Sequence, residues 1–79
     1  MNKNNQYYKE VSVIGAGAWG TALAEVISRQ GNKVNLWARE NNVVKSINTS
    51  KTNDLYLPNI KLSEHINAHN NLSDVLNCD

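Results

Sequence analysis

The sequence predicts an α/β fold with a parallel sheet, because its first half alternates between the patterns of strands and of a helix. Residues 10–14 are a short run rich in β-branched side chains, residues 18–30 carry apolar residues at helical spacing, and residues 33–38 alternate apolar and polar side chains. A strand, a crossover helix and a second strand form a βαβ unit, whose two strands run parallel. With 79 residues, the chain is shorter than a usual domain.

Local signals delimit each of these three elements. The first strand stops at Gly15, and Gly31 follows the helix as a C-terminal stop. Within the helix, Glu25 lies four residues before Arg29, a spacing that allows an ion pair on one face. The apolar residues at helical spacing are Trp19, Leu23, Val26 and Ile27. The residues that share one face of the second strand are Val34, Leu36 and Ala38.

The rest of the chain predicts a second helix, a third short strand and a final helical turn. Apolar residues at helical spacing place the second helix at 41–48, and a polar loop follows at 49–54. The third strand is expected at 66–69, and Asn71 is a suitable N-cap for a turn through Leu76. Residues 1–9 form a polar lead-in, and no internal repeat or domain boundary interrupts the chain. The expected architecture is therefore a partial doubly wound α/β sheet in one unit, 1–79.

Composition and charge exclude several classes of partner. Eight basic and seven acidic residues are scattered along the chain, giving a net charge of +1 and no basic face for nucleic acid. No run of 18 apolar residues predicts a membrane span, and the polar start lacks the apolar region of a signal peptide. A single cysteine, Cys78, cannot form an internal disulfide. We therefore expect a cytoplasmic location.

The glycine-rich segment between the first strand and the first helix carries the strongest functional signal. Gly15, Gly17 and Gly20 form a G-x-G-x-x-G pattern, which is weak alone but specific after a strand and at the start of a helix in a βαβ unit. In the Rossmann fold the first glycine allows a tight turn, the second lets the backbone approach the pyrophosphate, and the third lets the helix pack closely on the sheet. The helix N-terminus then holds the phosphates. The alternative is a glycine-rich turn that binds nothing.

The end of the second strand bears on the choice of cofactor. Folds that select NAD place an acidic residue there, on the ribose 2′-hydroxyl, but the inward position is Ala38, which accepts no hydrogen bond. Arg39 follows and can pair with a 2′-phosphate, so the local chemistry favours NADP. Glu40 opposes this preference, because it can reach the ribose hydroxyls or simply occupy the N-terminus of the next helix. A solvated surface role for Arg39 also remains open.

Other residues with chemical potential form no recognisable centre. Trp19, inside the motif, either contacts the cofactor or packs, whereas Trp37 is interpreted as structural. His65, His69 and Cys78 lack the spacing of metal ligands, so no metal site is expected. Neither histidine has neighbours that would make it a catalytic base, and no catalytic residue is predicted.

Three blocks resemble the start of the bacterial NAD(P)-dependent glycerol-3-phosphate dehydrogenases. They are VIGAGAWGTALA at residues 13–24, VNLWAR at residues 34–39 and YLP at residues 56–58. The resemblance runs over residues 10–79 and implies reduction of dihydroxyacetone phosphate to sn-glycerol 3-phosphate, the precursor of glycerophospholipids. It implies NADP or NAD as cofactor, with contacts along the turn from Gly15 to Gly20, including Ala18 and especially Trp19, and at Arg39.

Two departures from the family pattern affect this expectation. The family usually has serine where this chain has Ala18, so one hydroxyl contact to phosphate is lost while the backbone donors remain. A second basic residue often follows the arginine, but here that position is Glu40, which weakens the case for a strong NADP preference.

Family members continue for several hundred residues, and their substrate-binding and proton-moving groups lie in that later part. We therefore expect 1–79 to be the N-terminal part of a dinucleotide-binding domain, without the catalytic domain and inactive by itself. A small phosphorylated substrate is expected only for a full-length protein. One alternative is a non-enzymatic remnant or interaction module whose first strand, Val11 to Ile14, pairs through its open edge with a partner or with itself. Another is the start of a different NAD(P)-dependent enzyme, against which the YLP block argues.

Overall fold

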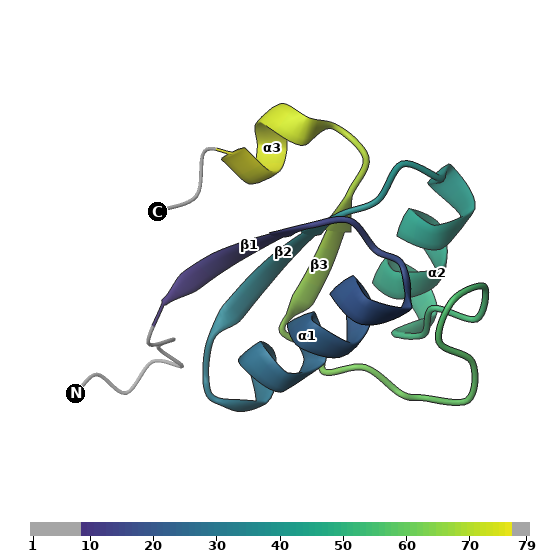
Figure 1. The fold of residues 1–79 in the computed structure, drawn as a ribbon, viewed down its shortest axis with the longest axis horizontal. Coiled ribbons are helices and arrows are strands. Elements are labelled where there is room, and N and C mark those ends of the chain that lie inside the picture. Colours follow the sequence, from purple (N-terminus) through teal and green to yellow (C-terminus); the bar gives the residue numbers. More distant parts are fainter. Residues whose placement is uncertain (1–8, 77–79) are drawn as a thin grey trace.

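The computed structural model describes residues 9–76 and confirms the predicted α/β class. Strands and helices alternate along the chain (Figure 1). The elements are β1 (Glu10–Ile14), α1 (Ala18–Arg29), β2 (Lys33–Trp37), α2 (Asn41–Ser50), β3 (Ile66–His69) and α3 (Leu72–Leu76). The third strand lies where the sequence predicted it. The predicted lead-in falls almost wholly outside the described residues, as does Cys78.

The three strands form one parallel sheet in the order β1-β2-β3. Val13 of β1 pairs with Leu36 of β2, and Leu36 pairs in turn with Ala68 of β3. Figure 1 shows α1 and α2 on one face of the sheet and α3 on the other. The face beneath α1 and α2 carries the apolar core, because alternate strand residues point the same way. The buried core residues are Val13, Ala16, Ala24, Val34, Leu36, Ala38, Val43, Ile47, Leu62, Ile66 and Ala68.

The short helix α3 is attached to the opposite face through the fully buried Val75 and a hydrogen bond. The Ser12 hydroxyl in β1 donates a 2.5 Å hydrogen bond to the carbonyl of Val75 in α3. At the helix start, the Asn71 side-chain oxygen accepts a hydrogen bond from the Ser73 N–H at 3.1 Å. The predicted Asn71 cap is thereby confirmed.

Element ends differ from the predicted ones by one or two residues. The first helix stops at Arg29 rather than residue 30, and the second strand stops at Trp37 rather than residue 38. The second helix runs to Ser50, so the predicted loop at 49–54 begins two residues late. It ends there because Lys51 takes a left-handed conformation with φ of 57°, which breaks the helical repeat. Gly31 has φ of 96°, as its predicted role of helix stop requires.

Of the large apolar residues at helical spacing in α1, Ile27 packs against the core. Trp19 is 88% exposed, and Leu23 and Val26 are both more than half exposed. The fully buried residues of α1 are smaller: Thr21, Ala24 and Ser28. The predicted pair between Glu25 and Arg29 is present, with the Arg29 side chain exposed and the Glu25 side chain mostly buried.

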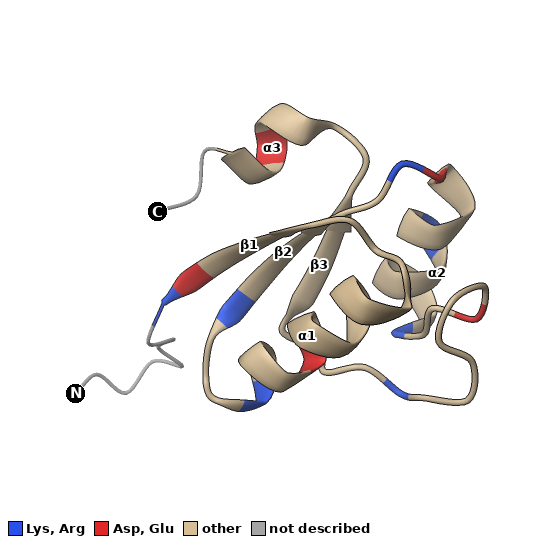
Figure 2. Cartoon of the chain, in the orientation of Figure 1, with Lys and Arg blue, Asp and Glu red and all other residues tan. Residues whose placement is uncertain are grey.

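Charge is distributed rather than clustered. Figure 2 shows basic and acidic positions spread over separate elements, with one of each adjacent where β2 leads into α2. Within the described residues, no helix is long and apolar enough to cross a membrane. Across 9–76, no three histidine, cysteine, aspartate or glutamate side chains gather as a metal site would require.

Candidate dinucleotide-binding site

A surface hollow of about 280 Å³ lies where β1 and β2 end. We call it the glycine hollow; its lining residues are Gly15, Ala16, Gly17, Trp37, Arg39, Glu40 and Tyr56. Four of the predicted cofactor residues therefore come together here: Gly15, Gly17, Arg39 and Glu40. In open α/β sheets, ligands bind at the carboxyl ends of the strands, which is this edge of the sheet.

Two of the glycines are required by the chain's own geometry. Gly15 has φ of +110°, which side-chain-bearing residues rarely adopt, and its N–H donates to the Trp37 carbonyl at 2.9 Å. A Cβ on Gly20 would lie 1.8 Å from the Gly15 carbonyl oxygen. The start of α1 thus presses directly against the end of the strand, as predicted for the third glycine of the motif.

Gly17 is different, because nothing in the described chain occupies the space a side chain would take. A Cβ placed there meets no atom within 4 Å, and its backbone has an ordinary extended conformation with φ of −69°. Beside it, α1 begins without a side-chain cap and without an acidic residue in its first turn. The first N–H groups of a helix have no partner within the helix and carry partial positive charge. Open space next to uncapped N–H donors fits the phosphates of a dinucleotide.

A buried polar network holds this turn in place. The amide nitrogen of Asn53 donates to the Ala16 carbonyl at 2.9 Å and to the Thr21 hydroxyl at 2.7 Å. Thr21 itself donates to the Ala16 carbonyl at 3.1 Å. Asn53 and Thr21 are both fully buried, so their mutual hydrogen bonds replace lost contacts with water. No pattern in the sequence predicts this role of Asn53, which lies in the predicted polar loop at 49–54.

The two charged residues after β2 are exposed to different degrees and have different partners. Ala38 is 1% exposed and belongs to the core, as its inward position predicted, while Arg39 is exposed. Glu40 is the N-cap residue of α2, but its side chain makes no capping hydrogen bond. Instead, the Tyr56 hydroxyl donates to its Oε2 at 2.7 Å. The N-terminal position that the sequence allowed for Glu40 is correct, although the carboxylate points elsewhere.

This contact shifts the ionisation of both groups. The hydrogen bond from Tyr56 lowers the pKa of Glu40, with further lowering from a backbone hydrogen bond and from the charge of Arg39. Accepting that hydrogen bond, Glu40 raises the pKa of the Tyr56 phenol, and its negative charge adds to the shift. At neutral pH the pair is therefore a carboxylate with a neutral phenol donor.

The remaining predicted residues lie beside the glycine hollow rather than in it. Ala18 and Trp19 line a neighbouring shallow apolar hollow together with Ala22 and Leu57. Because Trp19 is 88% exposed, packing within the described residues does not account for it. Trp37, interpreted from the sequence as structural, lines the glycine hollow while its indole N–H donates to the Asn70 carbonyl at 3.2 Å. Tyr56 and Trp37 are thus the side chains at this edge that residue patterns alone did not assign to a site.

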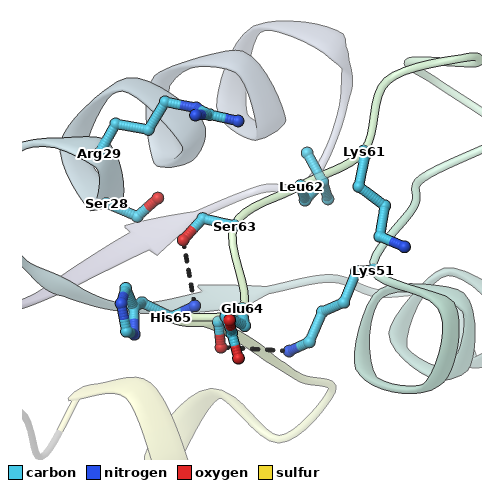
Figure 3. Close-up of a pocket in the computed structure, with 8 residues that line it drawn as sticks. All are labelled: Ser28, Arg29, Lys51, Lys61, Leu62, Ser63, Glu64 and His65. Atoms are coloured by element: carbon cyan, nitrogen blue, oxygen red, sulfur yellow. Dashed lines mark hydrogen bonds between the residues drawn. The ribbon is translucent and has the colours of Figure 1, made fainter.

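A larger hollow of about 660 Å³ lies at the opposite edge of the sheet, where β3 begins (Figure 3). Its lining residues are Ser28, Arg29, Lys51, Lys61, Leu62, Ser63, Glu64 and His65. Figure 3 shows the basic side chains spread around the rim rather than converging on one point. Lys51 donates to the backbone carbonyls of Glu64 and Ile66, and Arg29 pairs with Glu25. Lys51 and Arg29 thus stabilise the chain itself, which makes the glycine hollow the better candidate for a cofactor site despite its smaller volume.

Comparison with known proteins agrees with this geometry. Residues 10–79 match the family described as the N-terminus of NAD-dependent glycerol-3-phosphate dehydrogenase. The glycerol-3-phosphate dehydrogenase [NAD(P)+] of Maricaulis maris is 47% identical over 72 residues, which cover 91% of this chain and 22% of that protein. The enzyme of Syntrophobacter fumaroxidans is 50% identical over 66 residues, covering 84% of this chain and 19% of that protein.

Solved structures show the same relationship. A crystal structure of glycerol-3-phosphate dehydrogenase from Coxiella burnetii superposes with a TM-score of 0.78 at 40% identity, covering 86% of this chain and 21% of that one. The Plasmodium falciparum enzyme gives 0.78 at 30% identity, covering 90% of this chain and 22% of that one. The chain spans about a fifth of the length of these relatives. With a Rossmann-type sheet, a glycine turn at its carboxyl edge and a family match over 10–79, the chain belongs to the family of NAD-dependent glycerol-3-phosphate dehydrogenase N-termini.

Proposed function

We propose that residues 9–76 bind the pyrophosphate and adenosine end of NAD or NADP in the glycine hollow, as the first part of a glycerol-3-phosphate dehydrogenase. The observation that carries this proposal is the open space at Gly17 beside the uncapped start of α1. No internal contact calls for glycine at this position, whereas a phosphate lying against the backbone does. Arg39 and Glu40 line the same hollow, and we propose that they contact the adenosine ribose.

Titration of the chain with NADH and NADPH, followed by the fluorescence of the reduced nicotinamide, tests this proposal. We expect weak saturable binding of both, because the chain supplies one side of the site. Gly17→Val should weaken both affinities by at least about tenfold, since the new side chain fills the place of the pyrophosphate. Its extended backbone accepts valine, so the circular dichroism spectrum should remain that of the parent. Unchanged affinity in a folded Gly17→Val protein would refute the site.

The reaction proposed for the whole enzyme follows from the family. Hydride transfer between a nicotinamide and dihydroxyacetone phosphate requires both to be held together, and the proposed residues bind the dinucleotide only. The 79 residues alone should therefore bind cofactor without oxidising it when dihydroxyacetone phosphate is added. Loss of NADH absorbance at 340 nm that depends on this substrate would contradict that division of roles.

A second proposal concerns β1, which lies along one side of the sheet. Among the described residues β1 is the outer strand, and alternate residues of it hydrogen-bond to β2, which leaves the main-chain groups of Ser12 and Ile14 directed to the other side. An open edge of this kind pairs readily with another strand. We propose that the isolated chain dimerises through β1. Sedimentation velocity should show a dimer that Ile14→Lys disperses, because a charged side chain on an edge opposes pairing. A concentration-independent monomer would contradict it.

The cytoplasmic location and the absence of nucleic-acid partners remain predictions from the sequence.

A further inference from the structure

The side chain of Glu40 is held in an orientation that its position in the chain does not dictate. As the N-cap residue of α2, it lies next to backbone N–H groups that attract a carboxylate, and Arg39 precedes it as a competing cation. Yet its side chain makes no capping bond, and Oε2 accepts the Tyr56 hydroxyl at 2.7 Å. A glutamate side chain has three rotatable bonds and can therefore adopt several orientations. The hydrogen bond from the Tyr56 hydroxyl selects one of them.

Tyr56 is itself fixed by the residues that shape the glycine turn. Its backbone N–H donates to the Asn53 side-chain oxygen at 3.4 Å, and the Leu57 N–H donates to the Asn53 carbonyl at 2.7 Å. The buried amide of Asn53 is bonded in turn to Ala16 and Thr21. The hydroxyl that reaches Glu40 therefore comes from a loop anchored under the turn, and it is set at a defined place relative to the glycine hollow.

We propose that the hydrogen bond from Tyr56 to Glu40 sets the choice between NADH and NADPH. It holds the carboxylate in the glycine hollow, where the second carboxylate oxygen accepts a ribose 2′-hydroxyl and the negative charge repels a 2′-phosphate. Tyr56 acts here as a positioning residue, and Glu40 is the group that contacts the ribose. Arg39, on the same rim, favours the 2′-phosphate, so the balance between the two cofactors depends on where the carboxylate lies. This inference rests on the proposed function.

The ionisation of the pair supports the same arrangement. The lowered pKa of Glu40 keeps it charged, as repulsion of a phosphate requires, and the raised pKa of Tyr56 keeps its proton available for donation. Specificity of this kind depends as much on disfavouring the wrong ligand as on contacts to the right one.

The test is a double-mutant cycle on binding, with Kd measured for NADH and for NADPH by titration calorimetry. Tyr56→Phe removes only the hydroxyl, and we expect it to raise the Kd for NADH by about threefold to tenfold while leaving that for NADPH unchanged or lower. Glu40→Gln removes the charge, and we expect the ratio of the two constants to shift toward NADPH by about tenfold or more. In the double variant the ratio should equal that of Glu40→Gln alone within about twofold, because Tyr56 acts through the carboxylate.

Glu64→Gln is the matched control, since it removes one exposed carboxylate at the opposite edge of the sheet. The ratio of its Kd values for NADH and NADPH should equal that of the parent chain. If Glu64→Gln shifted this ratio as much as Glu40→Gln does, the cause would be a bulk charge effect, and the inference would be overturned. An unchanged ratio in Tyr56→Phe, with both cofactors still binding the parent, would also overturn it while leaving the proposed function intact. Failure of the parent to bind either cofactor would instead refute the proposed function.

Discussion

Replacing Gly20 by alanine tests whether the glycine turn is packed as tightly as its geometry indicates. The added Cβ would lie 1.8 Å from the Gly15 carbonyl oxygen, whereas real Cβ atoms stay beyond 3.0 Å, so the helix start must retreat by about 1.2 Å. Neither side moves freely. Gly15 is held to Trp37 by a 2.9 Å hydrogen bond, and α1 is seated on the sheet through the fully buried Ala24.

The cost follows from this lack of room. Overpacking a well-packed site costs about 1–3 kcal/mol, and a backbone-to-side-chain clash this short belongs at or above the upper end of that range. A chain of this size has a free energy of unfolding of about 4–12 kcal/mol. Gly20→Ala should therefore remove a quarter or more of the stability.

Urea denaturation followed by circular dichroism at 222 nm measures the effect. With a slope of about 1 kcal/mol per molar urea for a small chain, the midpoint of Gly20→Ala should fall by about 3 M or more. Gly17→Ala is the matched control: its Cβ meets nothing within 4 Å, so its midpoint should move by less than about 1 M. Equal midpoints for Gly20→Ala and the parent, or an equal fall for Gly17→Ala, would refute this account of the turn.

Three further predictions test other contacts. Asn53→Ala leaves the Ala16 carbonyl and the Thr21 hydroxyl short of a buried partner and should lower the free energy of unfolding by about 1–3 kcal/mol, measured by the same denaturation; a loss below about 0.5 kcal/mol would contradict the network. Gly31→Ala should cost about 1 kcal/mol, because φ of 96° strains any residue with a side chain, and a neutral or stabilising effect would argue against that backbone geometry. The lowered pKa of Glu40 stabilises the fold above the unfolded-state pKa of a glutamate, and that contribution is lost as pH falls through the lower folded value. The raised pKa of Tyr56 contributes below the unfolded-state pKa of a tyrosine and is lost as pH rises through the higher folded value, so the hydrogen bond should persist between about pH 5 and pH 9. Carbon-13 NMR titration of the tyrosine ring should show that Glu40→Gln lowers the pKa of Tyr56 toward its ordinary value, whereas an unmoved pKa would exclude the contact in solution.

The fold could be predicted well from the sequence, because the local signals place the elements where the sheet has them. β-branched runs, glycine stops and the Asn71 cap each act within a few residues, and they located every strand and helix of the described chain to within two residues. The inward position of Ala38 followed from the alternation of a strand with one buried face. The C-terminal end of the second helix was harder to predict, because the left-handed Lys51 that stops it carries no residue signature of its own.

The site was only partly predictable, and distance along the chain explains why. The glycines and Arg39 lie in or beside motifs that can be read locally, but Tyr56 reaches Glu40 across 16 residues and Asn53 reaches Ala16 across 37. A periodic pattern can predict contacts that repeat along an element. A single side-chain hydrogen bond does not repeat, so no periodic pattern predicts it. Apolar spacing likewise predicted α1 as a helix but not which of its apolar residues are buried, because spacing does not report which partner the helix meets.

The tie between Asn53 and the glycine turn also has a consequence for the order in which the molecule assembles. The carbonyl of Ala16 has a local partner in the Thr21 hydroxyl, but it gains the Asn53 amide only when the chain has passed through β2 and α2 and returned to the turn. Such a contact closes a long loop, and the entropy of closing it must be overcome before the contact forms. We expect hydrogen exchange near the turn to respond to the opening of the loop at 51–57, so that the local stability of the most recognisable motif of the sequence depends on a segment far from it along the chain.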